Sequence, residues 1–158
     1  MKRGRTLYLA LFKLSHVQLI AATDPINANK ESNLVSAIKE LSDGGVHVSI
    51  DALGSKITCQ NSISNLRKRG KHIQVGLLAG DQANPPIPME KIIAGELEII
   101  GSHGMQAHAY PEMLKMIESG KLQPQKLIQK RISLDETPTA LMEMDNFENM
   151  GITVINQF

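Results

Sequence analysis

The chain has 158 residues, a formal net charge of +1 and 42% hydrophobic residues. This length is enough for one domain with a real core, and the near-neutral charge and 3% aromatic content give no reason to expect nucleic acid as a partner. No apolar run approaches the roughly 20 residues that cross a bilayer, and a lone cysteine forms no internal disulfide, so we expect a cytoplasmic protein with no membrane partner.

The N-terminal part of the chain contains weakly patterned segments followed by one clear helix. We expect a short helix at residues 7–14, a strand at 17–21 and a turn region at 24–29. A helix capped by Asn29 or Ser32 then ends near Leu41, because apolar side chains recur at helical spacing.

Residues 43–78 have the pattern of one complete βαβ unit. A buried strand is predicted at 46–53, with Val46, Val48 and Ile50 on one side and His47, Ser49 and Asp51 on the other. Ser55 is a good cap for a helix over 56–69, which Gly70 ends, and a second buried strand follows at 72–79.

The remaining elements also alternate between helix and strand. The proline-rich segment 81–88 is a predicted loop. The other predicted elements are a helix at 89–94, a buried strand at 97–100, a bend at 101–104, a helix at 109–119, a strand at 127–132, a helix within 135–147 capped by Asp135 or Thr137, and a strand at 152–156.

This alternation predicts an α/β fold with a parallel sheet. Ligands of such sheets bind at the carboxyl ends of the strands, which here are residues 51–55, 76–78 and 101–104. Each of these corners contains glycine, which allows a sharp turn and a close approach of the backbone to a ligand. The simpler interpretation, that glycine only terminates each strand, stays open.

The same residues resemble a known family, the zinc-type alcohol dehydrogenases of the medium-chain dehydrogenase/reductase superfamily. The resemblance runs from about Ser32 to Phe158 and is poor before Ser32. It is carried by GGVHVSIDALG, NLRKRGKHIQVGLL, ELEIIGSHGMQAHAYPEMLKMIESGKL and the closing ISLDETPTALMEMDNFENMGITVINQF.

The resemblance implies the second half of a Rossmann-type NAD(P)-binding domain. It divides the chain into an atypical N-terminal segment (1–31), a partial NAD(P)-binding Rossmann-like domain (32–104), and a C-terminal helix with a return to a catalytic-domain-like segment (105–158). The family's G-x-G-x-x-G turn and zinc ligands lie upstream of the matched region and have no counterpart in this sequence. We therefore expect a truncated or downstream part of an oxidoreductase that does not catalyse alcohol/aldehyde hydride transfer by itself, with no catalytic residue and no metal ligand in this chain.

The resemblance also implies which residues contact NAD(P). At the end of the strand at 46–53, Ala52, Leu53 and Gly54 would line the cofactor cleft. At the end of the strand at 72–79, Gly76, Leu77 and Leu78 would flank the nicotinamide riboside. After the strand at 97–100, backbone groups of Gly101, Ser102 and His103 would approach the carboxamide.

Several features have alternative interpretations. Asp51 either orients a ribose hydroxyl, helps Ser55 to cap the next helix or is solvated. His103 and His108 are interpreted as surface or loop histidines. The basic residues 67–71 are interpreted as a solvated helix end. Buried positions are predicted for Cys59, Met113, Met116 and Ile117.

The alternative function is a non-catalytic module that forms a homo-oligomer or binds a nucleotide weakly. Leu97, Ile99 and Ile100 form an apolar edge strand, and an unpaired edge tends to find a partner. Without the first half of its sheet, the chain would also expose the side of the sheet beside 46–53, and residues 1–30 are the candidates to cover it.

Overall fold

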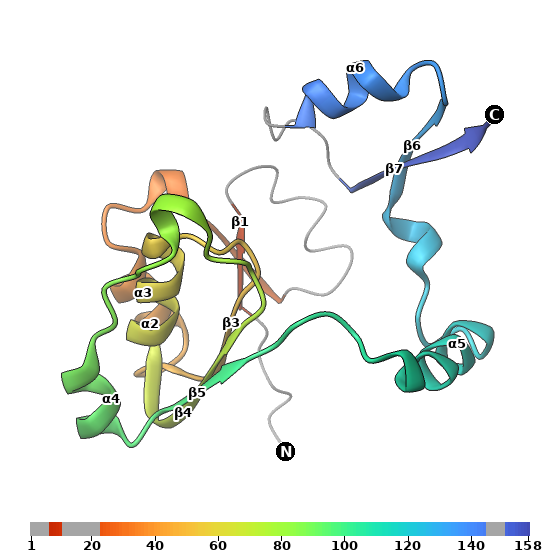
Figure 1. Cartoon of the computed structure of the whole chain (residues 1–158). Coiled ribbons are helices and arrows are strands. Elements are labelled where there is room, and N and C mark those ends of the chain that lie inside the picture. The colour runs from red at the N-terminus through yellow and green to blue at the C-terminus, as the bar shows by residue number, and fades with distance from the viewer. Residues whose placement is uncertain (1–6, 11–22, 145–150) are drawn as a thin grey trace. The chain divides into compact units, whose positions relative to one another are not determined.

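The computed structural model describes residues 7–10, 23–144 and 151–158. The chain divides into two compact units, residues 1–103 and 104–158, which are treated separately below (Figure 1). The predicted strand at 17–21 lies outside the described residues.

The first unit begins with a parallel pair of short strands, β1 (Leu7–Ala10) and β2 (Asp24–Asn27), followed by the 3-10 helix η1 (Ala28–Lys30). The predicted helix at 7–14 is therefore wrong for residues 7–10, and its remainder lies outside the described residues. Asp24-Pro25 lies in a strand rather than a turn. Proline fits here because a two-stranded sheet consists only of edge strands, where a missing N–H is tolerated.

Helix α2 (Leu34–Leu41) confirms the predicted helix but not its cap. The cap is Asn33, whose side-chain oxygen accepts a hydrogen bond from the backbone N–H of Ser36 at 3.0 Å. Asn29, one of the two predicted caps, lies within η1, and its backbone N–H donates to the side chain of Asn27, which caps η1.

The βαβ unit is present, but its helix is shorter than predicted. Helix α3 (Lys56–Ser64) starts at the expected cap, Ser55, which forms a reciprocal capping box with Thr58. The helix ends before β4 (Leu66–Gln74), so residues 66–69 and Gly70 are strand, not helix.

Tertiary contacts explain this early helix end. The backbone N–H of Val46 donates to the carbonyl of Asn65 at 2.9 Å. The guanidinium of Arg67 donates to the carbonyls of Ser42, Asp43 and Gly45. These hydrogen bonds hold residues 65–67 against residues 42–46, so the chain continues as strand. The interpretation of residues 67–71 as a solvated helix end is therefore wrong for Arg67.

A parallel sheet of three strands in the order β3-β4-β5 forms the centre of the first unit and confirms the predicted α/β class. Its outer strands are β3 (Val46–Asp51) and β5 (Glu98–Gly101). Before β5, the loop predicted at 81–88 includes the 3-10 helix η2 (Gly80–Gln82), and α4 (Met89–Gly95) confirms the predicted helix.

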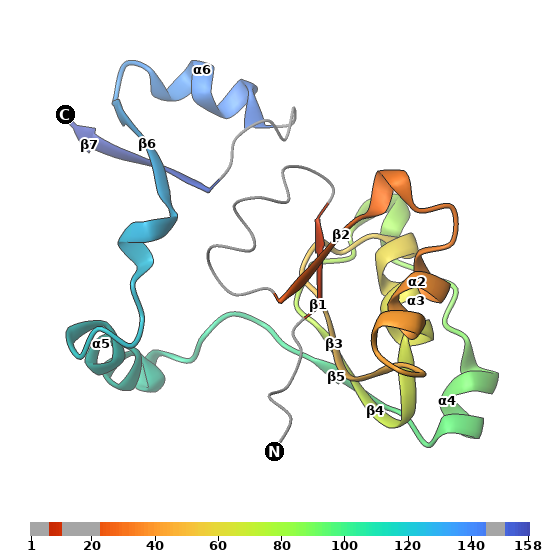
Figure 2. The same ribbon diagram turned by 180° about the vertical axis from the view of Figure 1, so that it is seen from behind.

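The helices α2, α3 and α4 lie on one side of this sheet (Figures 1 and 2). That side carries polar residues of the sheet, which meet polar residues of α3. The hydroxyl of Thr58 donates to Asp51, and the hydroxyl of Ser62 lies 3.1 Å from Nδ1 of His72. The opposite side carries Ile50, Ile73 and Ile100 in one row.

This arrangement corrects the prediction that the apolar side of these strands is buried. Ile50 is 62% exposed, Val48 is about half exposed, and every residue of β5 is exposed. No described part of residues 1–30 covers these side chains fully.

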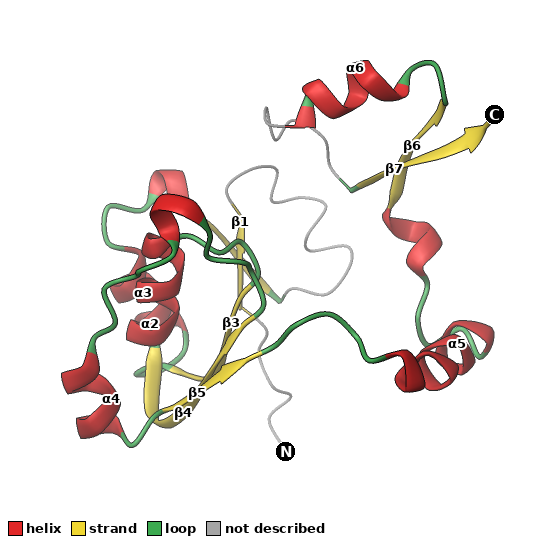
Figure 3. Cartoon of the chain, in the orientation of Figure 1, coloured by secondary structure: helices red, strands yellow, loops and turns green. Residues whose placement is uncertain are grey.

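The second unit consists of short elements (Figure 3). A parallel pair forms between β6 (Ile128–Ser133) and β7 (Ile152–Gln157), which confirms both predicted strands. The other elements are η3 (Ala107–Ala109), α5 (Tyr110–Glu118), η4 (Pro124–Leu127) and α6 (Thr137–Met142).

Two side-chain predictions fail in this unit. The core positions assigned to Met113, Met116 and Ile117 are wrong, because α5 contains no buried residue and Met116 is exposed. The residue before α6 is Glu136, not Asp135, and it makes no side-chain cap. Its carboxylate instead accepts hydrogen bonds from the N–H and hydroxyl of Ser133.

Candidate functional site

The corners after β3 and β4 lie directly against each other. The backbone N–H groups of Val75 and Gly76 donate to the carbonyl of Asp51 at 2.9 and 2.8 Å. The predicted residues Ala52, Leu53 and Gly54 are thereby brought beside Gly76 and Leu77, with Leu78 next in the chain. Leu53 and Leu77 project into solvent, and Leu77 is 77% exposed.

Glycine is required at both corners because their backbones touch. Gly54 has φ +82°, and a Cβ there would lie 2.5 Å from the carbonyl oxygen of Leu77. A Cβ on Gly76 would meet the amide nitrogen of Gly54. The glycines therefore do more than end strands, although packing of the two corners is enough to explain them.

The third corner follows the neighbouring strand at the same edge of the sheet. The backbone N–H of Ser102 donates to the carbonyl of Gln74 at 2.9 Å. Gly101, Ser102 and His103 are all exposed, and a Cβ on Gly101 would meet no atom within 4 Å. All three predicted groups thus lie at the carboxyl ends of adjacent strands, and their role in cofactor binding stays a prediction.

Asp51 is a buried anchor for the first corner. Its side chain is 4% exposed and accepts hydrogen bonds from the N–H groups of Leu53 and Gly54, the hydroxyl of Thr58 and the side-chain amide of Gln74, at 3.0 to 3.1 Å. Burial raises the pKa of this carboxyl, but the hydrogen bonds from Gln74, Gly54, Thr58 and Leu53 outweigh burial and hold the pKa below its ordinary value of 3.8. The carboxylate is therefore used inside the protein, which argues against the ribose interpretation, and it supports the start of α3 only through the hydroxyl of Thr58.

Gln74 and His72 extend this anchor across the polar side of the sheet, and the sequence analysis did not identify either one. His72 is 1% exposed, and its Nε2 lies 3.0 Å from Oε1 of Gln74. A signal was available, because Ser49 and Asp51 on β3 and His72 and Gln74 on β4 repeat with the period of 2 that places polar residues on one side of a strand.

No metal centre is formed by the part of the chain that the structure describes. No three His, Cys, Asp or Glu side chains there gather closely enough to hold a metal ion. His103 and His108 are exposed, and Cys59 is buried as predicted. The described residues therefore do not fit a zinc site.

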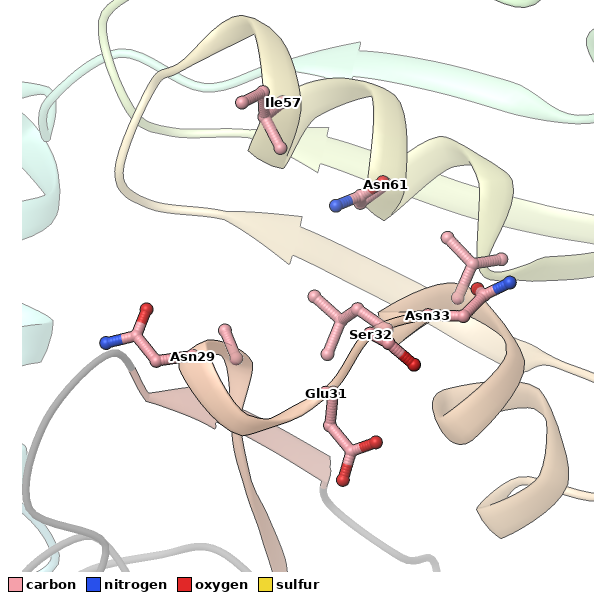
Figure 4. A pocket seen from close by; sticks show the side chains of 9 residues that line it. Asn29, Glu31, Ser32, Asn33, Ile57 and Asn61 are labelled. Atoms are coloured by element: carbon pink, nitrogen blue, oxygen red, sulfur yellow. The ribbon is translucent and has the colours of Figure 1, made fainter.

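A separate pocket of about 390 Å³ opens between residues 28–35 and α3 (Figure 4). Ile57 and Asn61 of α3 face Asn29, Glu31 and the neighbouring loop across it. None of its lining residues belongs to the three corners, so it is not part of the predicted cofactor site.

The parallel sheet with helices packed on it defines a Rossmann-like α/β chain. Residues 12–119 match the family model described as zinc-binding dehydrogenase. The chain belongs to the zinc-binding dehydrogenase family, which confirms the resemblance to the zinc-type alcohol dehydrogenases. The match begins at residue 12, upstream of residue 32 where the resemblance was expected to begin.

Individual relatives give the same picture. D-arabitol-phosphate dehydrogenase of Enterococcus avium is 31% identical over 114 residues, which are 72% of this chain and 32% of that protein. Sorbitol dehydrogenase of Bacillus subtilis (strain 168) is 25% identical over 143 residues, which are 90% of this chain and 40% of that protein.

Solved structures show the fold. An NAD-dependent alcohol dehydrogenase superposes with a TM-score of 0.84 at 18% identity, covering 98% of this chain and 44% of that chain. The chain thus spans between 32% and 44% of the length of these proteins. No helix among the described residues is both long enough and apolar enough to cross a membrane.

Proposed function

We propose that this chain supplies the nicotinamide-side wall of an NAD(P)-dependent alcohol dehydrogenase. The observation that carries the proposal is the meeting of 52–54 with 76–78 at the carboxyl edge of a parallel sheet, with 101–103 after the next strand. In a sheet of this type that edge is where ligands bind. When NAD(P) is bound, its nicotinamide carries the hydride.

Backbone groups, glycines and exposed leucines carry this proposed role. The open space beside Gly101 and the exposed Leu53 and Leu77 leave room for a flat ring against the corners. Asp51 is occupied by its own hydrogen bonds, so it shapes the wall and does not contact the cofactor. The chain would work in the cytoplasm, in keeping with a single, buried cysteine.

Nucleotide binding and turnover test the proposal separately. We expect purified protein to bind NADH with a Kd of about 1 mM, because one wall gives only part of the contacts of a closed site. NADH fluorescence and a thermal shift measure this binding, with adenosine monophosphate as the control ligand. A thermal shift from adenosine monophosphate equal to that from NADH would contradict a nicotinamide wall.

We expect these 158 residues alone to give no oxidation of alcohols. The described residues form no cluster that could hold a zinc ion, so none of them supplies the Lewis acid that polarises an alcohol. The assay follows NADH formation with a panel that includes sorbitol and D-arabitol, because two relatives carry polyol names. Turnover with any of these alcohols would refute the inactivity.

A second candidate function is self-assembly through the edge of the sheet. Among the described strands, β5 pairs with β4 alone, and its exposed residues include Ile99 and Ile100. An exposed apolar edge is a template for strand pairing. We propose a homo-oligomer through β5, which light scattering tests: Ile99→Lys should shift the protein to monomer, whereas Lys91→Ala on α4 should not.

A further inference from the structure

We propose that Gln74 is a positioning residue whose side-chain amide holds the first two corners in register, as one member of a partly buried relay running from Ser62 to Asp51. This inference rests on the proposed function, because the corners are the wall offered to nicotinamide. It goes beyond that function by assigning a role to side chains that are not among the corner residues themselves.

Gln74 contacts all three corners. Its side-chain Nε2 donates to Oδ2 of Asp51 at 3.0 Å, and Asp51 in turn holds the amides of Leu53 and Gly54. The same Nε2 donates to the carbonyl of Gly76 at 2.8 Å. The backbone carbonyl of Gln74 accepts from Ser102 at 2.9 Å.

The orientation of the Gln74 amide follows from its partners. Both groups near Nε2, the Asp51 carboxylate and the Gly76 carbonyl, only accept hydrogen bonds, so the nitrogen must face them. Oε1 therefore faces His72, and Nε2 of His72 must carry the proton that lies between them.

This tautomer determines the remote end of the relay. Nδ1 of His72 is then an acceptor, and it lies 3.1 Å from the hydroxyl of Ser62 and 3.3 Å from the hydroxyl of Ser49. Its single lone pair accepts from one hydroxyl at a time, and Ser62 is the nearer of the two. The result is a directed chain of donors from Ser62 on α3, through His72 and Gln74, to the Asp51 carboxylate.

Burial makes the relay sensitive to any missing member. His72 and Asp51 are almost fully buried, so water does not replace a lost partner at low cost. Removing the Gln74 amide leaves the Nε2–H of His72 and the carbonyl of Gly76 without their partners. The anchor of Leu53 and Gly54 then loses one of the donors that fix the Asp51 carboxylate.

The test compares Gln74→Met with Ile38→Val in the full chain. Methionine keeps the length of the side chain but has no amide, whereas Ile38→Val loosens the core of α2 away from the relay. Amide exchange by NMR is the first measurement. Gln74→Met should speed exchange of Leu53 and Gly54 about tenfold more than Ile38→Val does.

Two further measurements follow the relay and the wall. The ring ¹⁵N shifts of His72 should report the Nε2–H tautomer in the wild type and change in Gln74→Met. NADH fluorescence should show a Kd about tenfold higher for Gln74→Met and unchanged for Ile38→Val. If Gln74→Met does not fold, Ser62→Ala takes its place, with changes in the same direction but smaller.

The outcomes separate this inference from the proposed function. Unchanged exchange at Leu53 and Gly54 overturns the relay. Faster exchange with an unchanged NADH affinity overturns its role in positioning the wall. Faster exchange in a protein whose wild type binds no NADH supports the relay and refutes the proposed function.

Discussion

The Asp51 carboxylate makes a pH-dependent contribution to stability whose sign follows from its hydrogen bonds. Its pKa is below the ordinary value of 3.8 in the folded chain, so folding is favoured above that value and this contribution is lost as pH falls further. We expect Asp51→Asn to cost about 2 kcal/mol at neutral pH, because the new amide meets the donors of Thr58 and Gln74.

Urea unfolding at a series of pH values measures this effect. The difference between wild type and Asp51→Asn should narrow as the pH falls from 3.8 through the lowered pKa of the folded chain, where the wild-type carboxyl becomes protonated. The exposed Asp81→Asn is the matched control and should change stability little at any pH. A gap that stays constant into the acid range would show that the charge of Asp51 does not matter.

Cys59 should be an unreactive thiol in the folded chain. Burial raises its pKa, and the nearby negative charge of Asp51 raises it further, so little thiolate forms at neutral pH. A chromogenic disulfide reagent should therefore react slowly with native protein and quickly in urea. Rapid, stoichiometric reaction of the native protein would contradict the burial of Cys59.

At the scale of elements, the capping residue of α2 distinguishes the structure from the sequence prediction. Asn33→Ala should cost about 1 kcal/mol because it removes the bond to the N–H of Ser36. Ser32→Ala, at one of the two positions predicted as the cap, should have almost no effect. Thermal unfolding of both variants decides the matter, and equal losses would refute the Asn33 cap.

The two touching corners give a second contrast between similar substitutions. Gly76→Ala should destabilise by more than about 2 kcal/mol, because the new methyl group meets the backbone of Gly54 and the corners must separate. Gly101→Ala faces open space and should change stability by less than about 1 kcal/mol. Chemical unfolding measures both, and a neutral Gly76→Ala would mean that the corners are not in contact.

The sequence predicted elements best where local signals agreed with tertiary contacts. Ser55 as a cap, α4 between its flanking strands and the parallel β3–β5 sheet all follow from periodicity and turn chemistry. The end of α3 could not be predicted in this way, because Arg67 donates to carbonyls that lie far from it in sequence. The corners were predictable from glycines, whereas the His72–Gln74 relay required knowing that β3 and β4 are neighbours.

At the scale of the whole chain, the main sheet places its polar side against the helices and its apolar side outward. Polar Asp51 and His72 are buried under α3, while Ile50 and Val48 on the other side are 62% and 49% exposed. Exposed apolar surface of this kind attracts partners or other copies of the chain. The helix-covered side therefore supplies the stability of the sheet, and the apolar side should contribute little.

Substitutions on the two sides test this division. Ile50→Thr keeps a β-branched residue in β3, so it should change the free energy of unfolding by less than about 0.5 kcal/mol and lower the fluorescence of a bound hydrophobic dye. Ile63→Thr, at a fully buried position of α3, should cost at least about 3 kcal/mol because it buries a hydroxyl in a packed core. If Ile50→Thr were as costly as Ile63→Thr, Ile50 would have to be covered in solution, and the apolar side would be part of the core of an assembly.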